Sequence, residues 1–283
     1  MVPCSRRRFL QSSLAASVTG VAGCVFNPTG GSGCTEGRTR HDSDVSLDQA
    51  AAWAMYQYDA ANTGHNPDAS GPKTAGETAW RYSACTAADS GAIVHGGRAY
   101  AGGLVLTGRT GERIGGMWGG GRSTPAIVDG TMYVSATDLE AQNATTGESL
   151  WTFQTEGDMG GLPAPTVVDN TVYVPGNIDD PTLYAVDAET GVEQWRFQTE
   201  ADINAPTAVA AGTLYLVDKG DTVYALESET GEEQWRATHG GEELRRSAPV
   251  VVEDRVYLGS WRGAVLALQR RRSRRRRRLV TRF

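Results

Sequence analysis

Short runs of alternating apolar and polar residues, separated by turns, recur along most of the chain at a regular spacing. A tyrosine marks one such run in each copy, and successive copies from the second onward lie 40, 42 and 42 residues apart. Alternation over short runs is typical of β-strands, and glycine-containing turns between them indicate hairpins. The tyrosines are Tyr100, in a degenerate first copy, and then Tyr133, Tyr173, Tyr215 and Tyr257.

Each complete copy contains four such runs. Around Tyr173 they are "APTVVDN", "NTVYVPG", "PTLYAVD" and a last run that ends near a tryptophan. A period of about 40 residues holding four strands is the signature of a propeller blade. The sequence therefore predicts an all-β fold, a β-propeller of four-stranded antiparallel blades, with four copies and most of a fifth visible.

An eleven-residue phrase links the third and fourth strands in three copies. It reads "AQNATTGESLW" over 141–151, "AVDAETGVEQW" over 185–195 and "ALESETGEEQW" over 225–235. Glycine permits the positive φ that the turn requires, and the preceding Asp or Asn can accept hydrogen bonds from turn amides. We expect each tryptophan ring to wedge between one blade and the next. The structural docking residues are thus Trp151, Trp195, Trp235, Gly147, Gly191 and Gly231.

The phrase, A-x-[DN]-x-x-T-G-x-x-x-W, resembles the tryptophan-docking motif of pyrroloquinoline-quinone (PQQ)-type propellers. That family includes quinoprotein dehydrogenases and BamB-type assembly lipoproteins. The stretch "WAMYQYDAANTGHNP", residues 53–67, is similar to the segment that enters such propellers. The resemblance covers residues 53–269 and implies a closed ring of seven or eight blades.

Two copies of the phrase depart from the motif. The copy over 105–115 has Gly115 where the tryptophan belongs, so we expect a weaker junction there. The fifth copy starts at Ala267 and runs into arginines, with Arg277 at the tryptophan position. A frameshift or premature end, and hence a truncated propeller, is favoured over an evolved basic tail. The segment "ETAWRYS" around Trp80 could complete the last blade and close a five-bladed ring; otherwise the chain forms an open arc with exposed edges.

Charge is distributed unevenly. The net charge is −6, but nine arginines stand in the last fourteen residues and three in the first twenty-three. The remaining 246 residues carry all 33 acids and 15 bases (27 − 9 − 3), a net charge of −18. Such an acidic body argues against nucleic-acid binding and suits a halophilic, high-salt setting, although codon bias alone could explain the scarcity of lysine.

The N-terminus indicates export. "SRRRFLQ", which includes Arg6 and Arg7, resembles the twin-arginine (Tat) signal, and "VAGC" resembles the lipobox of exported lipoproteins, with Cys24 as the lipid attachment site. The apolar stretch between them is too short to span a bilayer. We expect a signal peptide over 1–23, a lipidated tether over 24–50, propeller repeats over 51–269, and an Arg-rich, out-of-frame or disordered tail over 270–283. The protein would then be lipid-anchored to the membrane at the cell surface.

No residue is assigned a catalytic, cofactor-binding or metal-ligating role. The adjacent cysteine pair that accompanies PQQ in the dehydrogenases is missing, and the four histidines show no ligand spacing, so PQQ and calcium are unsupported. Pairing of Cys34 with Cys85 stays open, and Trp261 is expected to pack. The leading hypothesis is a surface-anchored, non-catalytic binding or scaffold module with an unknown protein partner. The alternatives are a PQQ-binding redox protein and a truncated product without function.

Overall fold

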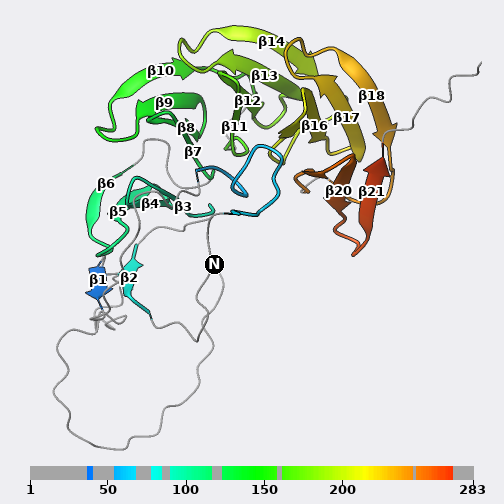
Figure 1. The fold of residues 1–283 in the computed structure, drawn as a ribbon. Helices are drawn as coiled ribbons and strands as arrows, with labels where there is room; N and C mark the ends of the chain where they lie inside the picture. Colours follow the sequence, from blue (N-terminus) through cyan, green and yellow to red (C-terminus); the bar gives the residue numbers. More distant parts are fainter. Residues whose placement is uncertain are drawn as a thin grey trace, which may run out of the picture.

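A computed structural model describes residues 37–40, 54–67, 78–84, 90–116, 123–157, 161–244 and 247–269. Within these ranges the chain forms 21 β-strands and no helix, which confirms the all-β prediction. The strands assemble into separate antiparallel sheets that stand side by side around a curved path (Figure 1). We number the five larger sheets as blades 1 to 5.

The first two blades each contain four strands in consecutive order. Blade 1 consists of β3 (Ile93–His95), β4 (Arg98–Ala101), β5 (Leu104–Thr107) and β6 (Arg113–Gly116). Blade 2 consists of β7 (Ala126–Val128), β8 (Thr131–Ser135), β9 (Leu139–Asn143) and β10 (Ser149–Phe153).

The next two blades are also four-stranded meanders, and the last has three strands. Blade 3 consists of β11 (Thr166–Val168), β12 (Thr171–Pro175), β13 (Thr182–Asp187) and β14 (Glu193–Gln198). Blade 4 consists of β15 (Ala208–Ala210), β16 (Thr213–Val217), β17 (Thr222–Glu227) and β18 (Glu233–Thr238). Blade 5 consists of β19 (Val250–Val252), β20 (Arg255–Gly259) and β21 (Val265–Gln269).

The Thr-Gly turn shapes the outer edge of each complete blade. Gly191 and Gly231 adopt φ values of +72° and +73°, in the left-handed region that glycine enters without strain. The ladder that follows shifts register by one residue in blades 3 and 4, next to Ala185 and Ala225. This bulge turns the fourth strand so that its tryptophan lies opposite the alanine that begins the phrase.

The core lies between blades rather than within them. Blade 2 contributes Tyr133 and Leu139 to one cluster, and blade 3 contributes Val172, Val174 and Tyr184 from its facing surface. All five side chains are buried. Because alternate residues of a strand point to opposite faces, one blade buries one set against its predecessor and the other against its successor. Each blade therefore depends on both neighbours for its core.

The five blades form an open arc (Figure 1). At one end, β2 (Trp80–Ser83) pairs with β1 (Gly37–Arg40) in a two-stranded sheet. At the other end, β21 pairs with β20 alone among the described strands. The segment around Trp80 thus does not complete blade 5, and the five-bladed ring is not formed. The structure shows the other arrangement considered from the sequence, four complete blades and a three-stranded fifth.

The entering segment, residues 54–67, runs along the inner rim of the arc. Backbone carbonyls of Ala54, Ala60 and Ala61 accept hydrogen bonds from N–H groups in the innermost strands β7, β15 and β19, at 2.7, 2.7 and 2.9 Å. The buried Asn62 side chain donates to carbonyls that precede β15 and β19, both at 3.0 Å. One segment therefore ties blades 2, 4 and 5 together at their inner edges.

Candidate functional site

Two tryptophan rings lie directly on the turn of the following blade. A Cβ atom placed on Gly191 would come within 2.7 Å of the Trp151 ring, and one on Gly231 within 2.6 Å of the Trp195 ring. Real Cβ atoms do not approach so closely, so glycine is needed here for space as well as for its positive φ. The motif T-G-x-x-x-W therefore encodes both partners of a blade junction, the ring and the surface that it covers.

Each of these junctions is also fixed by two hydrogen bonds to one carbonyl. The Trp195 indole N–H donates to the Ser228 carbonyl at 3.2 Å, and the Tyr173 hydroxyl donates to the same oxygen at 3.0 Å. Trp151 and Tyr133 bind the Ala188 carbonyl in the same way, both at 3.1 Å. Burial raises the pKa of both tyrosines, so the hydroxyl keeps the proton that it donates.

The turn that carries the glycine is held by its acidic residue. In blade 3 the Asp187 carboxylate accepts hydrogen bonds from the Thr190 hydroxyl at 2.7 Å and the Thr190 amide at 2.8 Å. These bonds, led by the hydroxyl, lower the pKa of Asp187. Asn143 accepts from the amides of Thr145 and Thr146 at 2.9 Å in the corresponding turn of blade 2. The Asp or Asn at the third position of the eleven-residue phrase therefore accepts hydrogen bonds within its own turn and stabilises it.

A second repeated cluster lies at the outer edge of blades 3 and 4. The Arg196 guanidinium stacks 5.3 Å from the centre of the Tyr184 ring and pairs with Glu193 at 2.7 Å and Glu156 at 3.1 Å. The Tyr184 hydroxyl donates to the Asp180 carboxylate at 2.9 Å. Burial, followed by this carboxylate, raises the pKa of Tyr184 to about 12. A hydroxyl held protonated in this way does not supply a general base near neutral pH.

Blade 4 repeats this cluster residue for residue. Arg236 stacks 5.3 Å from the Tyr224 ring centre and pairs with Glu233 and Glu200. The Tyr224 hydroxyl donates to Asp218 at 2.9 Å, and its pKa is again raised to about 12, first by burial. Recurrence at the same place in two blades indicates a structural role, because a catalytic site has no reason to repeat with the fold.

Trp80 is a further docking tryptophan, on the segment that the sequence offered as an added outer strand. The Trp80 ring covers Gly111 of blade 1, where an added Cβ would come within 2.5 Å, and its indole N–H donates to the Gly108 carbonyl at 2.8 Å. Strand β2 therefore corresponds to the fourth strand of a preceding blade. The signal was present in the tripeptide Trp-Arg-Tyr that begins at Trp80, which parallels Trp-Arg-Phe at Trp195.

The junction between blades 1 and 2 lacks the ring. In the described residues nothing lies within 4 Å of a Cβ placed on Gly147, the glycine that the missing tryptophan at Gly115 would cover. Instead, the Arg98 guanidinium donates to the carbonyls of Ala144 and Thr145, both at 3.0 Å. Ala144 is the counterpart of Ala188 and Ser228, so an arginine replaces the indole as hydrogen-bond donor.

The same junction contains a buried polar side chain. Gln142 is fully buried, and neither atom of its amide has a hydrogen-bond partner among the described residues. Val186 and Leu226, both apolar, occupy the equivalent place in blades 3 and 4. An unpaired buried amide costs about 1–3 kcal/mol, so this junction combines a lost ring with a polar group in its core.

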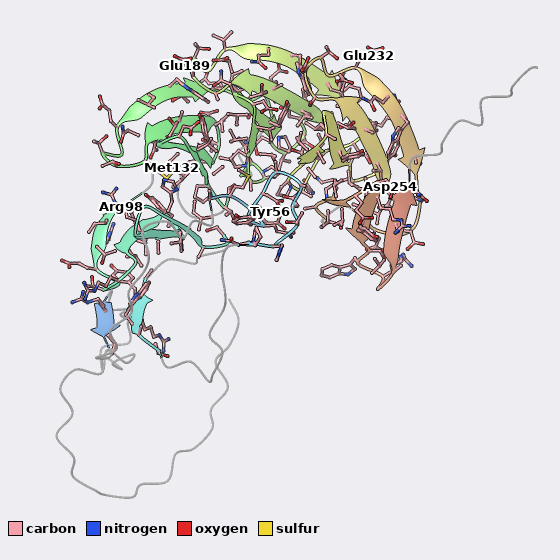
Figure 2. The ribbon with its side chains drawn as sticks, viewed as in Figure 1. Tyr56, Arg98, Met132, Glu189, Glu232 and Asp254 are labelled. Carbon is pink, nitrogen blue, oxygen red and sulfur yellow. The ribbon has the colours of Figure 1, made fainter. Side chains whose placement is uncertain are left out.

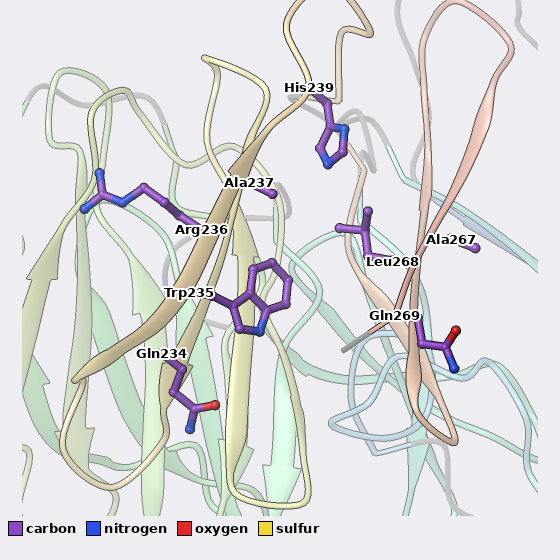
Figure 3. Close-up of a pocket in the computed structure, with 8 residues that line it drawn as sticks. All are labelled: Gln234, Trp235, Arg236, Ala237, His239, Ala267, Leu268 and Gln269. Carbon is purple, nitrogen blue, oxygen red and sulfur yellow. The ribbon is translucent and has the colours of Figure 1, made fainter. Parts of the chain in front are cut away.

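A groove of about 650 Å³ opens between blades 4 and 5 (Figure 3). Trp235 of β18 and Leu268 of β21 point into it from opposite sides, whereas Arg236 points away. Trp235 is the one predicted docking ring that covers no glycine in the described part of the chain. The groove is lined by Gln234, Trp235, Arg236, Ala237, His239, Ala267, Leu268 and Gln269.

Metal-ligating side chains do not gather in the described residues, which contain no group of three or more His, Cys, Asp or Glu side chains placed to hold a metal ion. Nor does any helix within these ranges have the length and apolarity to cross a membrane. Trp261, expected to pack, is instead 74% exposed in the turn between β20 and β21. Arg6, Arg7 and Cys24 lie outside the described residues.

Comparison with known proteins supports this architecture. The sequence model of the family described as "Outer membrane protein assembly factor BamB" matches residues 135–282, or 148 of 283 residues. No significant match is found among curated protein sequences.

Three solved structures that are similar to this chain differ in the extent of the likeness. Quinohemoprotein alcohol dehydrogenase from Comamonas testosteroni is 16% identical, with a TM-score of 0.53 over 78% of this chain and 49% of its own. The dehydrogenase ADHIIG from Pseudomonas putida HK5 is 18% identical, with a TM-score of 0.52 over 65% and 40%. BamB from Moraxella catarrhalis is 19% identical, with a TM-score of 0.46 over 63% and 55%. The chain thus spans about half the length of these proteins.

Proposed function

We propose that the protein is a non-catalytic binding or scaffold module for another protein. The premise is that the chain belongs to the PQQ-like repeat family whose model is described as "Outer membrane protein assembly factor BamB". One observation carries this proposal. The tyrosines, arginines and carboxylates that recur in the blades are engaged with one another across junctions and turns. A rigid frame of this kind displays loops, and its function resides in those loops.

We further propose that the protein works at the cell surface, held to the membrane by a lipid on Cys24 after export that depends on Arg6 and Arg7. The support is the order of the two motifs in the sequence. Replacing Cys24 with Ser is expected to move the protein from the membrane fraction to the medium, since a lipid supplies the buried CH₂ groups that hold it. Retention of Cys24→Ser in the membrane fraction would exclude this anchor.

Adding PQQ together with calcium separates the scaffold from a quinoprotein. A ligand that binds the folded state and not the unfolded chain raises the unfolding temperature, and the rise grows with the logarithm of its concentration above the dissociation constant. The scaffold predicts an unchanged midpoint at saturating PQQ and calcium. A raised midpoint would favour the redox alternative over the one proposed here.

The loops supply a direct test of partner binding. Trp261 is 74% exposed and belongs to the residue type that most often anchors protein interfaces. We expect Trp261→Ala to lower the amount of partner that co-purifies after cross-linking on intact cells. Leu150→Ala, at a site 52% exposed on the outer strand of blade 2, is the matched control and should retain it. Equal recovery with both variants would remove the loop from the interface.

A further inference from the structure

The turn between β9 and β10 carries a sequence pattern that the proposed function does not use. Residues 143–145 read Asn-Ala-Thr, and the pattern Asn-X-Ser/Thr, with X not proline, is the acceptor for N-linked sugars in exported proteins. The only other asparagine with a serine or threonine two residues later is Asn27, and Pro28 between them excludes it. Asn143 is therefore the one acceptor of this kind in the sequence.

The turn presents the amide nitrogen of Asn143. Its Oδ1 atom accepts hydrogen bonds from the backbone N–H groups of Thr145 and Thr146, both at 2.9 Å. Only the oxygen of a side-chain amide can accept such bonds, so Nδ2 lies on the side away from the turn. Among the described residues no hydrogen bond engages Nδ2. The oxygen thus holds the turn, while the nitrogen that a sugar would modify has no competing partner there.

The equivalent turn of blade 3 is filled where the turn of blade 2 is open. In blade 3, the Asp187 Oδ2 atom accepts hydrogen bonds from the side-chain amides of Asn170 at 3.1 Å and Gln194 at 3.5 Å. Blade 2 has Gly130 and Leu150 at these two positions, and neither side chain can donate or accept a hydrogen bond. A Cβ placed on Gly130 would meet no described atom within 4 Å. The two replacements leave room beside the turn residue in blade 2.

Two further features leave space around this turn. In the described residues nothing lies within 4 Å of a Cβ placed on Gly147, whereas Trp151 covers Gly191 in blade 3. Turns of this type also face outward, since Figure 2 shows Glu189 and Glu232, from the corresponding turns of blades 3 and 4, at the outer margin of the arc. A bulky hydrated group on the turn of blade 2 would therefore extend into solvent without displacing a packed side chain.

We propose that Asn143 is the attachment site of an N-linked glycan. This inference rests on the cell-surface location proposed above, and the sugar donor is a polyprenyl-linked oligosaccharide. In the transfer, Nδ2 forms a bond to the anomeric carbon of the first sugar, and the bond from that carbon to the lipid phosphate breaks. The phosphate leaves with the bonding electrons, and Nδ2 releases one proton. Oδ1 takes no part, so the modified asparagine still accepts the two hydrogen bonds that hold the turn.

Mass spectrometry of the full chain, isolated from its own cells, tests the site. Proteolytic peptides of the wild type that contain Asn143 should carry the added mass of one or more sugars. Thr145→Ala breaks the pattern and should abolish this mass, whereas Thr145→Ser keeps the pattern and should retain it. Thr146→Ala, at the next exposed threonine of the same turn, is the matched control and should be modified like the wild type. Asn143→Asp, which reproduces the acid found at Asp187, should fold and remain unmodified.

A second copy of the pattern tests the importance of the open turn. The paired change Asp187→Asn with Glu189→Thr writes Asn-Ala-Thr into the turn of blade 3. There Asn170 and Gln194 are placed to engage the new amide nitrogen. The turn of blade 3 should therefore stay unmodified while Asn143 in the same molecule carries the glycan. Equal modification of both turns would overturn the role given to the open space.

The surface location is measured separately, as cleavage of the protein by protease added to intact cells. A wild type that is cleaved in this way but carries no sugar on Asn143 overturns the inference and leaves the surface location standing. Sugar that persists on Asn143 in Thr145→Ala, or that is lost in Thr146→Ala, also overturns it. A wild type that is neither cleaved nor modified overturns the surface location and the glycan together.

Discussion

The junction between blades 3 and 4 and the junction between blades 1 and 2 solve one packing problem with different side chains. In the first, Trp195 covers Gly231 and donates to the Ser228 carbonyl. In the second, Arg98 donates to the equivalent carbonyl, of Ala144, and no ring covers Gly147 among the described residues. The arginine thus reproduces the hydrogen bond of the indole and none of its apolar contact.

The two junctions share the hydrogen bonds that position one blade against the next, but they differ in the apolar burial that stabilises the contact. In both junctions a tyrosine hydroxyl donates to the same carbonyl as the indole or guanidinium, at 3.0 Å for Tyr173 and 3.2 Å for Tyr100. This shared geometry fixes how one blade meets the next. An aromatic ring adds burial on the order of 200 Å², which at about 25 cal/mol/Å² contributes several kcal/mol. We therefore expect the ring, rather than the hydrogen bond, to distinguish the two junctions in stability.

The largest effect is expected from Trp195→Ala. Removal of the ring leaves a cavity over Gly231 and takes one of two hydrogen bonds from the Ser228 carbonyl, which Tyr173 still binds. The expected cost is about 3–5 kcal/mol of unfolding free energy. The measurement is the midpoint of urea or thermal unfolding. Trp261→Ala removes the same side chain from a site 74% exposed and should change stability by less than about 0.5 kcal/mol. Equal unfolding midpoints for Trp195→Ala and wild type would show that the ring does not hold the junction.

Alanine at two glycines isolates the contribution of the ring. Gly231 and Gly147 share a φ of +73°, so the backbone strain of alanine, about 1 kcal/mol, is common to both. Only at Gly231 would the new Cβ also displace a tryptophan, at 2.6 Å, which adds about 1–3 kcal/mol. Gly231→Ala should therefore unfold at lower denaturant than Gly147→Ala. Identical midpoints would mean that the close approach of Trp195 carries no energy.

At the weaker junction, Gln142→Leu is expected to stabilise the protein. The change removes an amide that has no hydrogen-bond partner in the described residues and restores the residue type found at Leu226. The gain should be about 1–2 kcal/mol of unfolding free energy, read from the urea midpoint. Leu226→Gln is the reciprocal control and should lose stability. A loss for Gln142→Leu would indicate that the amide is paired in the native protein.

Repetition made the blades predictable from sequence. The tyrosine spacing located four complete blades and the three inner strands of the fifth, because alternation and a Thr-Gly turn specify a hairpin locally. The segment around Trp80 was considered as the strand that completes the last blade, and this was wrong because its strand pairs instead with β1, far away in sequence. The substitution of Arg98 for a tryptophan was also missed, since the arginine comes from the second strand of the blade, whereas the motif places its ring on the fourth.

The smallest effect concerns pH, and it belongs to blades 3 and 4. Tyr184 and Tyr224 have pKa values raised from 10.0 to about 12, first by burial, so the folded protein retains protons that the unfolded chain releases near pH 10. Their contribution to stability is complete below pH 10 and is lost as pH rises toward 12. Ultraviolet absorbance of tyrosinate should show these two rings among the last to ionise, and Tyr184→Phe should remove one late step. Ionisation of all tyrosines in one step near pH 10, with the protein still folded, would contradict this expectation.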